Sequence, residues 1–124
     1  MNDRLAAPSP STADVIAWAA VFSGPLAWFA SQQASYALVP WACHGGTLIA
    51  IQLVNLAALL LVGVGGAMAW RELRRTGGQV SDETAPPLGR ARFLGLVGLS
   101  LSCLFALVIA AQALGAFFFG ACQR

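Results

Sequence analysis

Three long apolar runs constrain this chain more than any other feature of its sequence. They cover residues 13–38, 47–70 and 93–119, and charged residues occur only at their margins. About 20 apolar residues in a helix are enough to cross the hydrocarbon core of a bilayer, so each run is long enough to span a membrane. A segment in lipid must satisfy its own backbone hydrogen bonds, which favours helices. The sequence therefore predicts an all-α membrane protein, a bundle of three transmembrane helices.

The composition supports the same class. Of the 124 residues, 58% are hydrophobic and 10% are charged, and the mean hydropathy is +0.72. A water-soluble domain of this length would carry charge on about a quarter of its residues. The net charge of +2 comes from dispersed arginines, and no dense basic run exists that could follow a nucleic-acid backbone. We therefore expect the lipid bilayer as a partner and no nucleic acid.

The positions of the arginines predict the orientation. Residues 39–46, between the first two runs, contain no arginine, whereas six arginines lie before the first run or around residues 71–92: Arg4, Arg71, Arg74, Arg75, Arg90 and Arg92. Cytoplasmic segments carry an excess of such residues. We expect the N-terminus and the 71–92 loop to be cytoplasmic, and the 39–46 turn and the 120–124 tail to be periplasmic. Arginine without lysine is associated with GC-rich bacterial genomes, so the expected location is a bacterial inner membrane.

The segments outside the runs are expected to be connectors. Residues 1–12 are small, polar and proline-containing, which predicts a disordered N-terminus, and the 71–92 loop has the Gly and Pro content of a flexible linker. Ser11 and Asp14 have the spacing of a helix capping box, and Asp14 as a proton-relay carboxylate is the alternative. A cleavable signal peptide ending near Ala37 is the competing interpretation of the first run. It fits less well, because the run is long and is interrupted by Pro25.

Five carboxamide side chains form the clearest polar feature inside the runs. Each lies about 5 to 9 residues from the expected periplasmic boundary, on the order of 10 Å deep at 1.5 Å per residue. They are Gln32, Gln33, Gln52, Asn55 and Gln112, and we call them together the amide layer. A carboxamide facing lipid would lose its hydrogen bonds, so we expect these groups to turn inward and bind one another or a polar ligand. Helix packing and a ligand pocket both remain open as explanations.

Helical spacing predicts which faces pack. In the third run a single stripe is polar towards the periplasmic end and small towards the other: Gly95, Gly98, Ser102, Phe105, Ile109, Gln112 and Ala116. The second run repeats this pattern, at Gln52, Asn55, Leu59, Val62 and Gly66. The two stripes match as an antiparallel pair. In the first run Pro25 removes a backbone hydrogen bond and should kink the helix near the bilayer centre, next to the amide layer.

No catalytic or metal-binding motif is recognisable. His44 is the single histidine, and the Cys43-His44 dipeptide lacks the second pair of ligands that a zinc site needs, so a surface histidine at the mouth of the bundle is expected. Cys103 lies inside the third run and is expected to be a small buried hydrophobic residue. The chain has no Cys-x-x-Cys pair, phosphate loop or carboxylate pair. We expect no cofactor, no bound metal and no enzymatic activity.

Cys43 and Cys122 are predicted to form a disulfide. The first run must lead to the periplasmic side and the third must end there, so both thiols reach the compartment in which disulfides persist. The bond would connect the end of the third helix to the turn between the first two. Two alternatives remain: a pair of free thiols that bind a soft metal such as Cu(I) beside His44, and unpaired cysteines.

Several short stretches together resemble a group of small, uncharacterised bacterial membrane proteins. The resemblance covers the whole chain and includes residues 24–28 (GPLAW), 36–43 (YALVPWAC), 92–94 (RFL), 102–105 (SCLF) and Cys122. That group is associated with haem-copper oxidase gene clusters. The resemblance implies an accessory or assembly role beside a respiratory oxidase and identifies no catalytic residue.

The expected function is therefore that of a non-catalytic subunit of a larger membrane complex. Three helices bury little surface, and the remainder, including residues 117–119, could pack against another membrane protein. The rival hypothesis is a small ligand-binding or transport protein that uses the amide layer and the Pro25 kink. A pocket that reaches the amide layer from outside would distinguish them.

Overall fold

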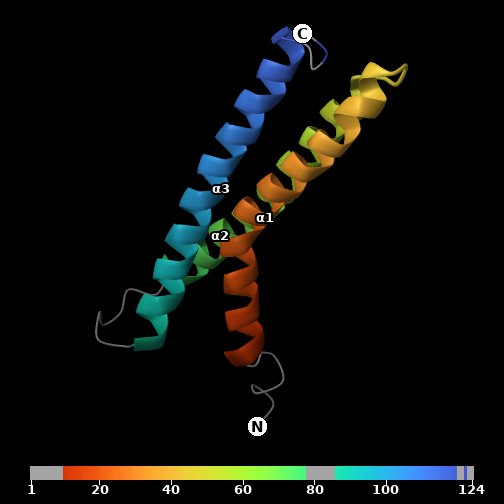
Figure 1. The fold of residues 1–124 in the computed structure, drawn as a ribbon. Helices are drawn as coiled ribbons and strands as arrows, with labels where there is room; N and C mark the ends of the chain where they lie inside the picture. Colours follow the sequence, from red (N-terminus) through yellow and green to blue (C-terminus); the bar gives the residue numbers. More distant parts are fainter. Residues whose placement is uncertain (1–9, 78–85, 120–121, 123–124) are drawn as a thin grey trace.

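The computed structural model is a bundle of three long helices and describes residues 10–77, 86–119 and 122 (Figure 1). The helices are α1 (Pro10–Cys43), α2 (Ile49–Gly77) and α3 (Pro86–Phe119), and the described residues contain no strand. Each helix includes a stretch long and apolar enough to cross a membrane, at Asp14–Cys43, Ile49–Arg75 and Arg92–Phe119. The predicted all-α fold with three candidate spans is confirmed.

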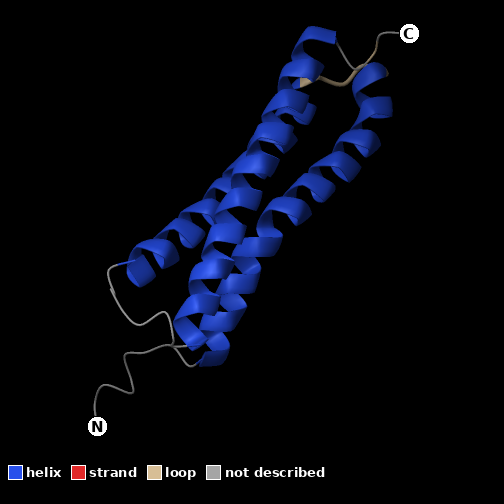
Figure 2. Ribbon diagram, turned by 90° about the vertical axis from the view of Figure 1, so that its left-hand side faces the viewer, coloured by secondary structure: helices blue, strands red, loops and turns tan. Residues whose placement is uncertain are grey.

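The helices alternate in direction, and each packs against the other two. The turn between α1 and α2 lies at the same end of the bundle as the end of α3, and Figure 2 shows the short turn as the loop between two adjacent helices. We call this end, with Cys43 and Cys122, the disulfide end. The opposite end carries the last turn of α2 and the start of α3, and we call it the arginine end. The predicted N-terminal segment 1–12 lies almost wholly outside the described residues, as does most of the 120–124 tail.

All three helices extend beyond the apolar runs. α1 continues through Pro40 to Cys43, and α3 begins at Pro86, inside the expected 71–92 loop. Proline at the first position of α3 is favourable, because its missing N–H would have no helical partner there. α1 begins at Pro10, so Ser11 lies inside its first turn and Asp14 in its second. A capping box needs Ser11 directly before the first helical residue, so the predicted capping box is wrong.

Two glycines close the α1–α2 turn. The Trp41 carbonyl accepts hydrogen bonds from the backbone N–H groups of His44 (3.2 Å) and Gly46 (3.1 Å), and Gly45 has a φ of 119°. The bond from Gly46 to Trp41 spans six residues and follows Gly45, which has a positive φ. This is a common motif at helix C-termini, and the positive φ favours glycine. A Cβ atom at Gly46 would lie 2.6 Å from the Trp41 ring, so this position also needs a residue without a side chain.

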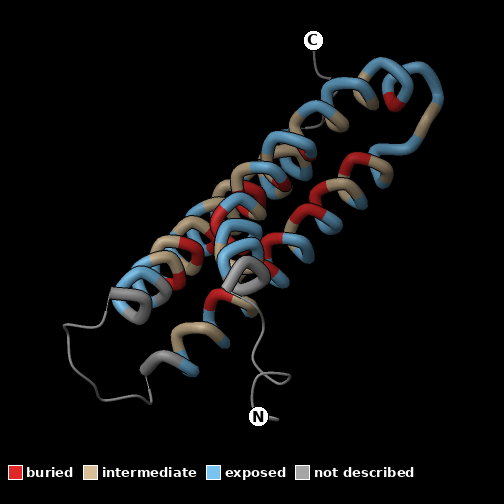
Figure 3. The backbone as a smooth tube through the Cα atoms, turned by 90° about the horizontal axis from the view of Figure 1, so that it is seen from below, coloured by how far each residue is buried: buried red, intermediate tan, exposed pale blue. Residues whose placement is uncertain are grey.

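The predicted buried stripes are confirmed. Gly95, Gly98 and Ser102 of α3 are buried, Ile109 is fully buried, and the other three members of that stripe are half-buried. Figure 3 shows the buried positions on the facing sides of the helices and the exposed ones outside. The hydrophobic core consists of Ala27, Ala58, Val62 and Ile109, with Trp28, Leu59 and Ala106 against it.

Small residues allow the three backbones to approach one another. A Cβ atom at Gly65 of α2 would overlap the Ser23 hydroxyl of α1, and one at Gly98 of α3 would lie 3.5 Å from the Ala69 Cβ and 3.6 Å from the Ala20 backbone. Close backbone approach at glycine is the usual way in which helices associate in lipid. The bundle is therefore tightest at the level of these residues.

α1 bends partway along its length (Figure 1). Pro25 lies in the middle of this helix, and a proline there removes the hydrogen bond to the carbonyl four residues earlier and crowds that turn. The bend is the kink that the sequence predicts. Gly24, directly before Pro25, packs on α3, because a Cβ atom there would lie 3.1 Å from the Phe105 ring.

Candidate functional site

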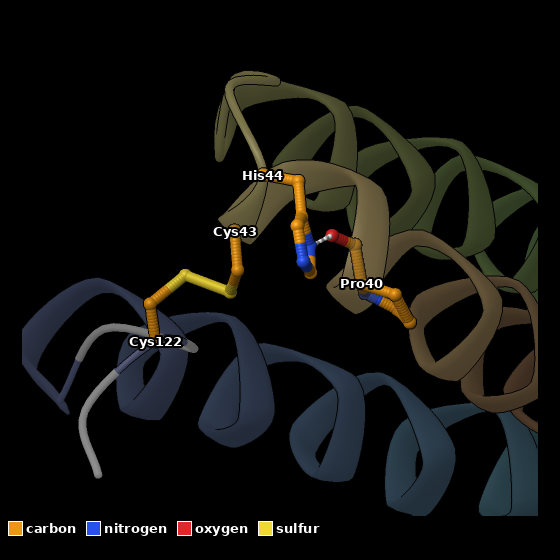
Figure 4. The surroundings of a disulfide bond; sticks show 4 residues. All are labelled: Pro40, Cys43, His44 and Cys122. Carbon is orange, nitrogen blue, oxygen red and sulfur yellow. Dashed lines mark hydrogen bonds between the residues drawn. A yellow bond between two sulfur atoms is a disulfide. The ribbon is translucent and has the colours of Figure 1, made fainter.

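The disulfide end contains the covalent link that the sequence predicts. Cys43 and Cys122 form a disulfide across 79 residues of sequence, with Cα atoms 5.7 Å apart, and both residues are exposed. Figure 4 shows that the bond joins the last turn of α1 to the chain just after α3. It therefore connects α3 to the hairpin of the other two helices. Oxidised sulfurs are not thiolate ligands, so this arrangement does not support the Cu(I) alternative.

His44 is bonded back to the end of its own helix. Its Nδ1 lies 2.6 Å from the Pro40 carbonyl oxygen (Figure 4), and because that oxygen can only accept, Nδ1 carries the hydrogen. The residue is exposed, as expected for a histidine at the mouth of the bundle. Within residues 10–77, 86–119 and 122, no three His, Cys, Asp or Glu side chains come together as a metal site.

The amide layer is only partly the network that we expected. Gln52 of α2 donates through Nε2 to the Ala113 carbonyl of α3 at 3.3 Å, so it bonds to backbone and not to another amide. Asn55 is buried, and Gln32 and Gln112 are half-buried. Gln33 is exposed, so its predicted inward orientation is wrong. Gln32 and Gln33 are adjacent in a helix and lie about 100° apart around its axis, so both cannot face the interior.

Three hydroxyl groups and one indole lie in the middle of the bundle. Ser23 and Ser31 donate to the carbonyls of Ala20 (2.9 Å) and Trp28 (2.7 Å), three residues earlier in α1. Among the described residues, the buried Ser102 hydroxyl and the buried Nε1 of Trp28 have no hydrogen-bond partner. The Trp28 ring packs against Phe105 with 5.9 Å between ring centroids. The prediction of the amide layer did not identify the buried Trp28 indole, because it considered carboxamide side chains only.

Cys103 does not lie where the sequence places it. It is a free cysteine on the exposed side of α3, so the expectation of a buried thiol is wrong. The physical reason is its register: Ser102, one residue earlier, occupies the stripe that faces α2. In a membrane the exposed side of a spanning helix contacts lipid or another protein, so an apolar side chain of this size is equally suited to either side.

An apolar groove lies between α1 and α2. It has a volume of about 440 Å³, within the usual ~300–1,000 Å³ of ligand pockets, and its lining consists of Ala19, Ser23, Leu26, Ala27, Ala30, Leu61, Val64, Gly65 and Met68. None of the five predicted amides lines this groove. On both α1 and α2, the groove lies nearer to the arginine end than the amides do. The pocket expected for the ligand-binding hypothesis is thus not this one.

The arginine end is positively charged and has an aromatic ring at its edge. Arg74 lies over the ring of Trp70 with 5.7 Å from its guanidinium carbon to the ring centroid, and Arg75 pairs with Glu72 at 4.0 Å. Basic residues in the last turn of α2 are favourable beside the negative end of the helix dipole. Arginine and tryptophan together are typical of a helix end at a membrane–water interface.

These features define a class: a multi-pass membrane protein built as a bundle of three helices with a disulfide at one end. No family model, no curated protein and no solved structure matches the chain.

Proposed function

We propose that this chain is a non-catalytic subunit of a larger complex in the bacterial inner membrane, where it has an accessory or assembly role. The N-terminus and the arginine end would face the cytoplasm and the disulfide end the periplasm. The arginine distribution and the preference of disulfides for oxidising compartments support this orientation. The sequence resemblance to proteins of haem-copper oxidase gene clusters makes a respiratory oxidase the expected partner.

One observation carries the proposal: three consecutive aromatic residues at the end of α3 are exposed. Phe117, Phe118 and Phe119 are 78%, 75% and 73% exposed, and Phe117 and Phe118 contact each other edge to face at 6.0 Å. The disulfide follows directly, so this part of α3 is held by a covalent bond rather than by packing. Aromatic rings offer large contact area at low entropic cost. Such a surface at a fixed position suits a second membrane protein.

The polar groups inside the bundle support the same conclusion. The Gln52 side chain holds α2 to α3, and the Ser23 and Ser31 hydroxyls bond within α1. The Gln52 amide contributes to cohesion between two helices and the two hydroxyls are already hydrogen-bonded, so these groups leave the outer surface as the place where a partner would act. The α1–α2 groove offers the rival ligand-binding hypothesis none of the amides on which it depends.

A site-specific crosslink tests the proposal. A photoreactive residue in place of Phe118 should capture a defined membrane partner in native membranes, and mass spectrometry should identify it, with oxidase subunits expected. The matched control is Leu60, which is 65% exposed on α2 and lies away from the end of α3. Equal and unspecific crosslinking from both positions would mean that the three phenylalanines face lipid only, and the proposal would be abandoned.

Reporter fusions test the orientation. A fusion at Gly78 should behave as cytoplasmic and one after Arg124 as periplasmic, because the charge bias around residues 71–92 exceeds the single charge at the C-terminus. A periplasmic signal at Gly78 would reverse the bundle and place the disulfide in a reducing compartment.

A further inference from the structure

The groove between α1 and α2 has an apolar lining, and its position decides what can fill it. Every lining residue lies within a candidate membrane span, between residues 19 and 30 of α1 and between 61 and 68 of α2. Its one hydroxyl, on Ser23, already donates to the Ala20 carbonyl. The groove therefore offers no polar group in need of a partner, and in a bilayer it suits a flexible hydrocarbon chain.

The groove leads towards the arginine end of α2. Met68, its lining residue nearest that end on α2, is followed three, four and seven residues later by Arg71, Glu72 and Arg75, and residues at these spacings lie on one side of a helix. The Glu72 carboxylate pairs with Arg75. At 1.5 Å per residue, Arg71 lies about 4.5 Å and Arg75 about 10 Å further along the axis. A molecule with its chain in the groove would thus bring its head to these guanidinium groups.

The charges at the end of α2 favour an anion. Residues 71–75 contain three arginines and one glutamate, a net charge of +2. Arg75 pairs with Glu72 and Arg74 lies over Trp70, whereas Arg71 is exposed and makes no ion pair within the described residues. Arginine binds phosphate through paired N–H donors. Arg71 is the side chain best placed to accept a phosphate at the mouth of the groove.

We propose that this groove binds an anionic phospholipid, with an acyl chain between α1 and α2 and the phosphate at Arg71. The occupant is a lipid and not a second copy of the chain, because the basic mouth is complementary to a phosphate and would face another basic mouth in a symmetric dimer. The site is independent of the accessory role, since a lipid can bind whether or not a partner subunit does.

Native mass spectrometry of the full chain in mild detergent tests this site. The probes are phosphatidylglycerol and phosphatidylcholine with identical acyl chains. The wild type should retain phosphatidylglycerol about fivefold better, because phosphatidylglycerol has a net negative charge whereas the choline cation cancels the phosphate charge of phosphatidylcholine, and one arginine near an anionic headgroup contributes about 1 kcal/mol. Arg71→Gln should remove most of that preference, while Arg90→Gln, at an exposed arginine of α3, should keep it.

Variants that fill the groove distinguish a lipid bound in the groove from lipid bound elsewhere on the apolar surface. Ala30→Phe and Val64→Phe each place a ring in the groove from one wall and should abolish lipid retention, whereas Ala37→Phe and Leu60→Phe, at exposed positions outside the groove, should retain it. Formation of the Cys43–Cys122 bond on a non-reducing gel reports that each variant folds.

Three results would overturn the proposal. They are equal retention of the two lipids by the wild type, unchanged retention in both groove variants, and a wild-type dimer that the groove variants dissociate. The last result would assign the groove to a second copy of the chain. If a groove variant fails to form the disulfide, the comparison of Arg71→Gln with Arg90→Gln still decides whether the anionic headgroup lies at Arg71.

Discussion

The two halves of the bundle are held together by different means. Towards the arginine end, α2 and α3 meet through glycine: a Cβ atom at Gly95 would lie 3.1 Å from the Leu73 side chain, and one at Gly66 would lie 3.3 Å from Ser102. Towards the disulfide end, α3 is held by the Gln52 hydrogen bond to Ala113 and by the Cys43–Cys122 bond, and its last residues are exposed. The half at the arginine end is thus held by close backbone packing, and the half at the disulfide end is held by a hydrogen bond and a disulfide.

Helices in lipid thus need specific contacts wherever they lack small residues. No hydrophobic driving force acts between helices in a bilayer, because lipid tails are as apolar as leucine. Large exposed side chains at the end of α3 therefore contribute nothing to cohesion by themselves. The comparison predicts that perturbations at the disulfide end act through single bonds and that those at the arginine end act through steric overlap.

The largest expected effect is loss of the disulfide. Cys122→Ser should lower the free energy of unfolding by about 4 kcal/mol, because the bond closes a loop of 79 residues and restricts the unfolded chain. Detergent-denaturation curves measure the change, and Cys103→Ser is the matched control, since Cys103 is free and exposed. Alkylation before reduction should modify Cys103 alone and leave a peptide linking Cys43 to Cys122. Recovery of all three cysteines as alkylated residues would contradict the link.

Steric overlap at the tight level of the bundle should have the next largest effect. Gly65→Leu should destabilise the protein by about 1–3 kcal/mol, because a side chain there would displace Ser23 and separate α1 from α2. Gly63→Leu is the matched control in the same helix, since a Cβ built there would have no atom of another helix within 4 Å. Equal losses of stability in the two variants would indicate that helix propensity and not interhelical contact governs this half.

The smallest expected effect concerns the polar contact near the disulfide end. Gln52→Leu and Asn55→Leu should each cost about 1 kcal/mol, the usual size of an interhelical polar contribution in a membrane. Gln33→Leu should leave the unfolding curve unchanged, because Gln33 is exposed and faces away from the other helices. A large loss at position 33 would show that its amide is bound to something outside the bundle.

A variant at Asn55 also distinguishes packing from function. If Asn55 only holds helices together, Asn55→Leu should leave a captured partner's activity measurable at normal protein levels. Loss of partner activity with unchanged stability would favour a functional pocket at the amide layer over the packing role.

The class of fold, the faces that pack and the covalent link could all be predicted from the sequence. Apolar length alone predicts three spans, since the bilayer thickness sets how many residues a helix needs. The 3.6-residue period predicts the stripe from Gly95 to Ile109, and topology brings Cys43 and Cys122 to one end. These are properties of local geometry and of chain direction, which require no knowledge of the neighbours.

Which polar and reactive groups face inward depends on the packing of the three helices against one another. Gln32 and Gln33 are chemically identical, yet one is half-buried and the other exposed, and Ser102 occupies the packed stripe while Cys103 lies outside it. The bond from Gln52 to a backbone carbonyl and the groove beside Ser23 depend in the same way on how far each helix is rotated about its axis. A shift of one residue is a rotation of about 100°, and only contact with the other two helices selects that rotation.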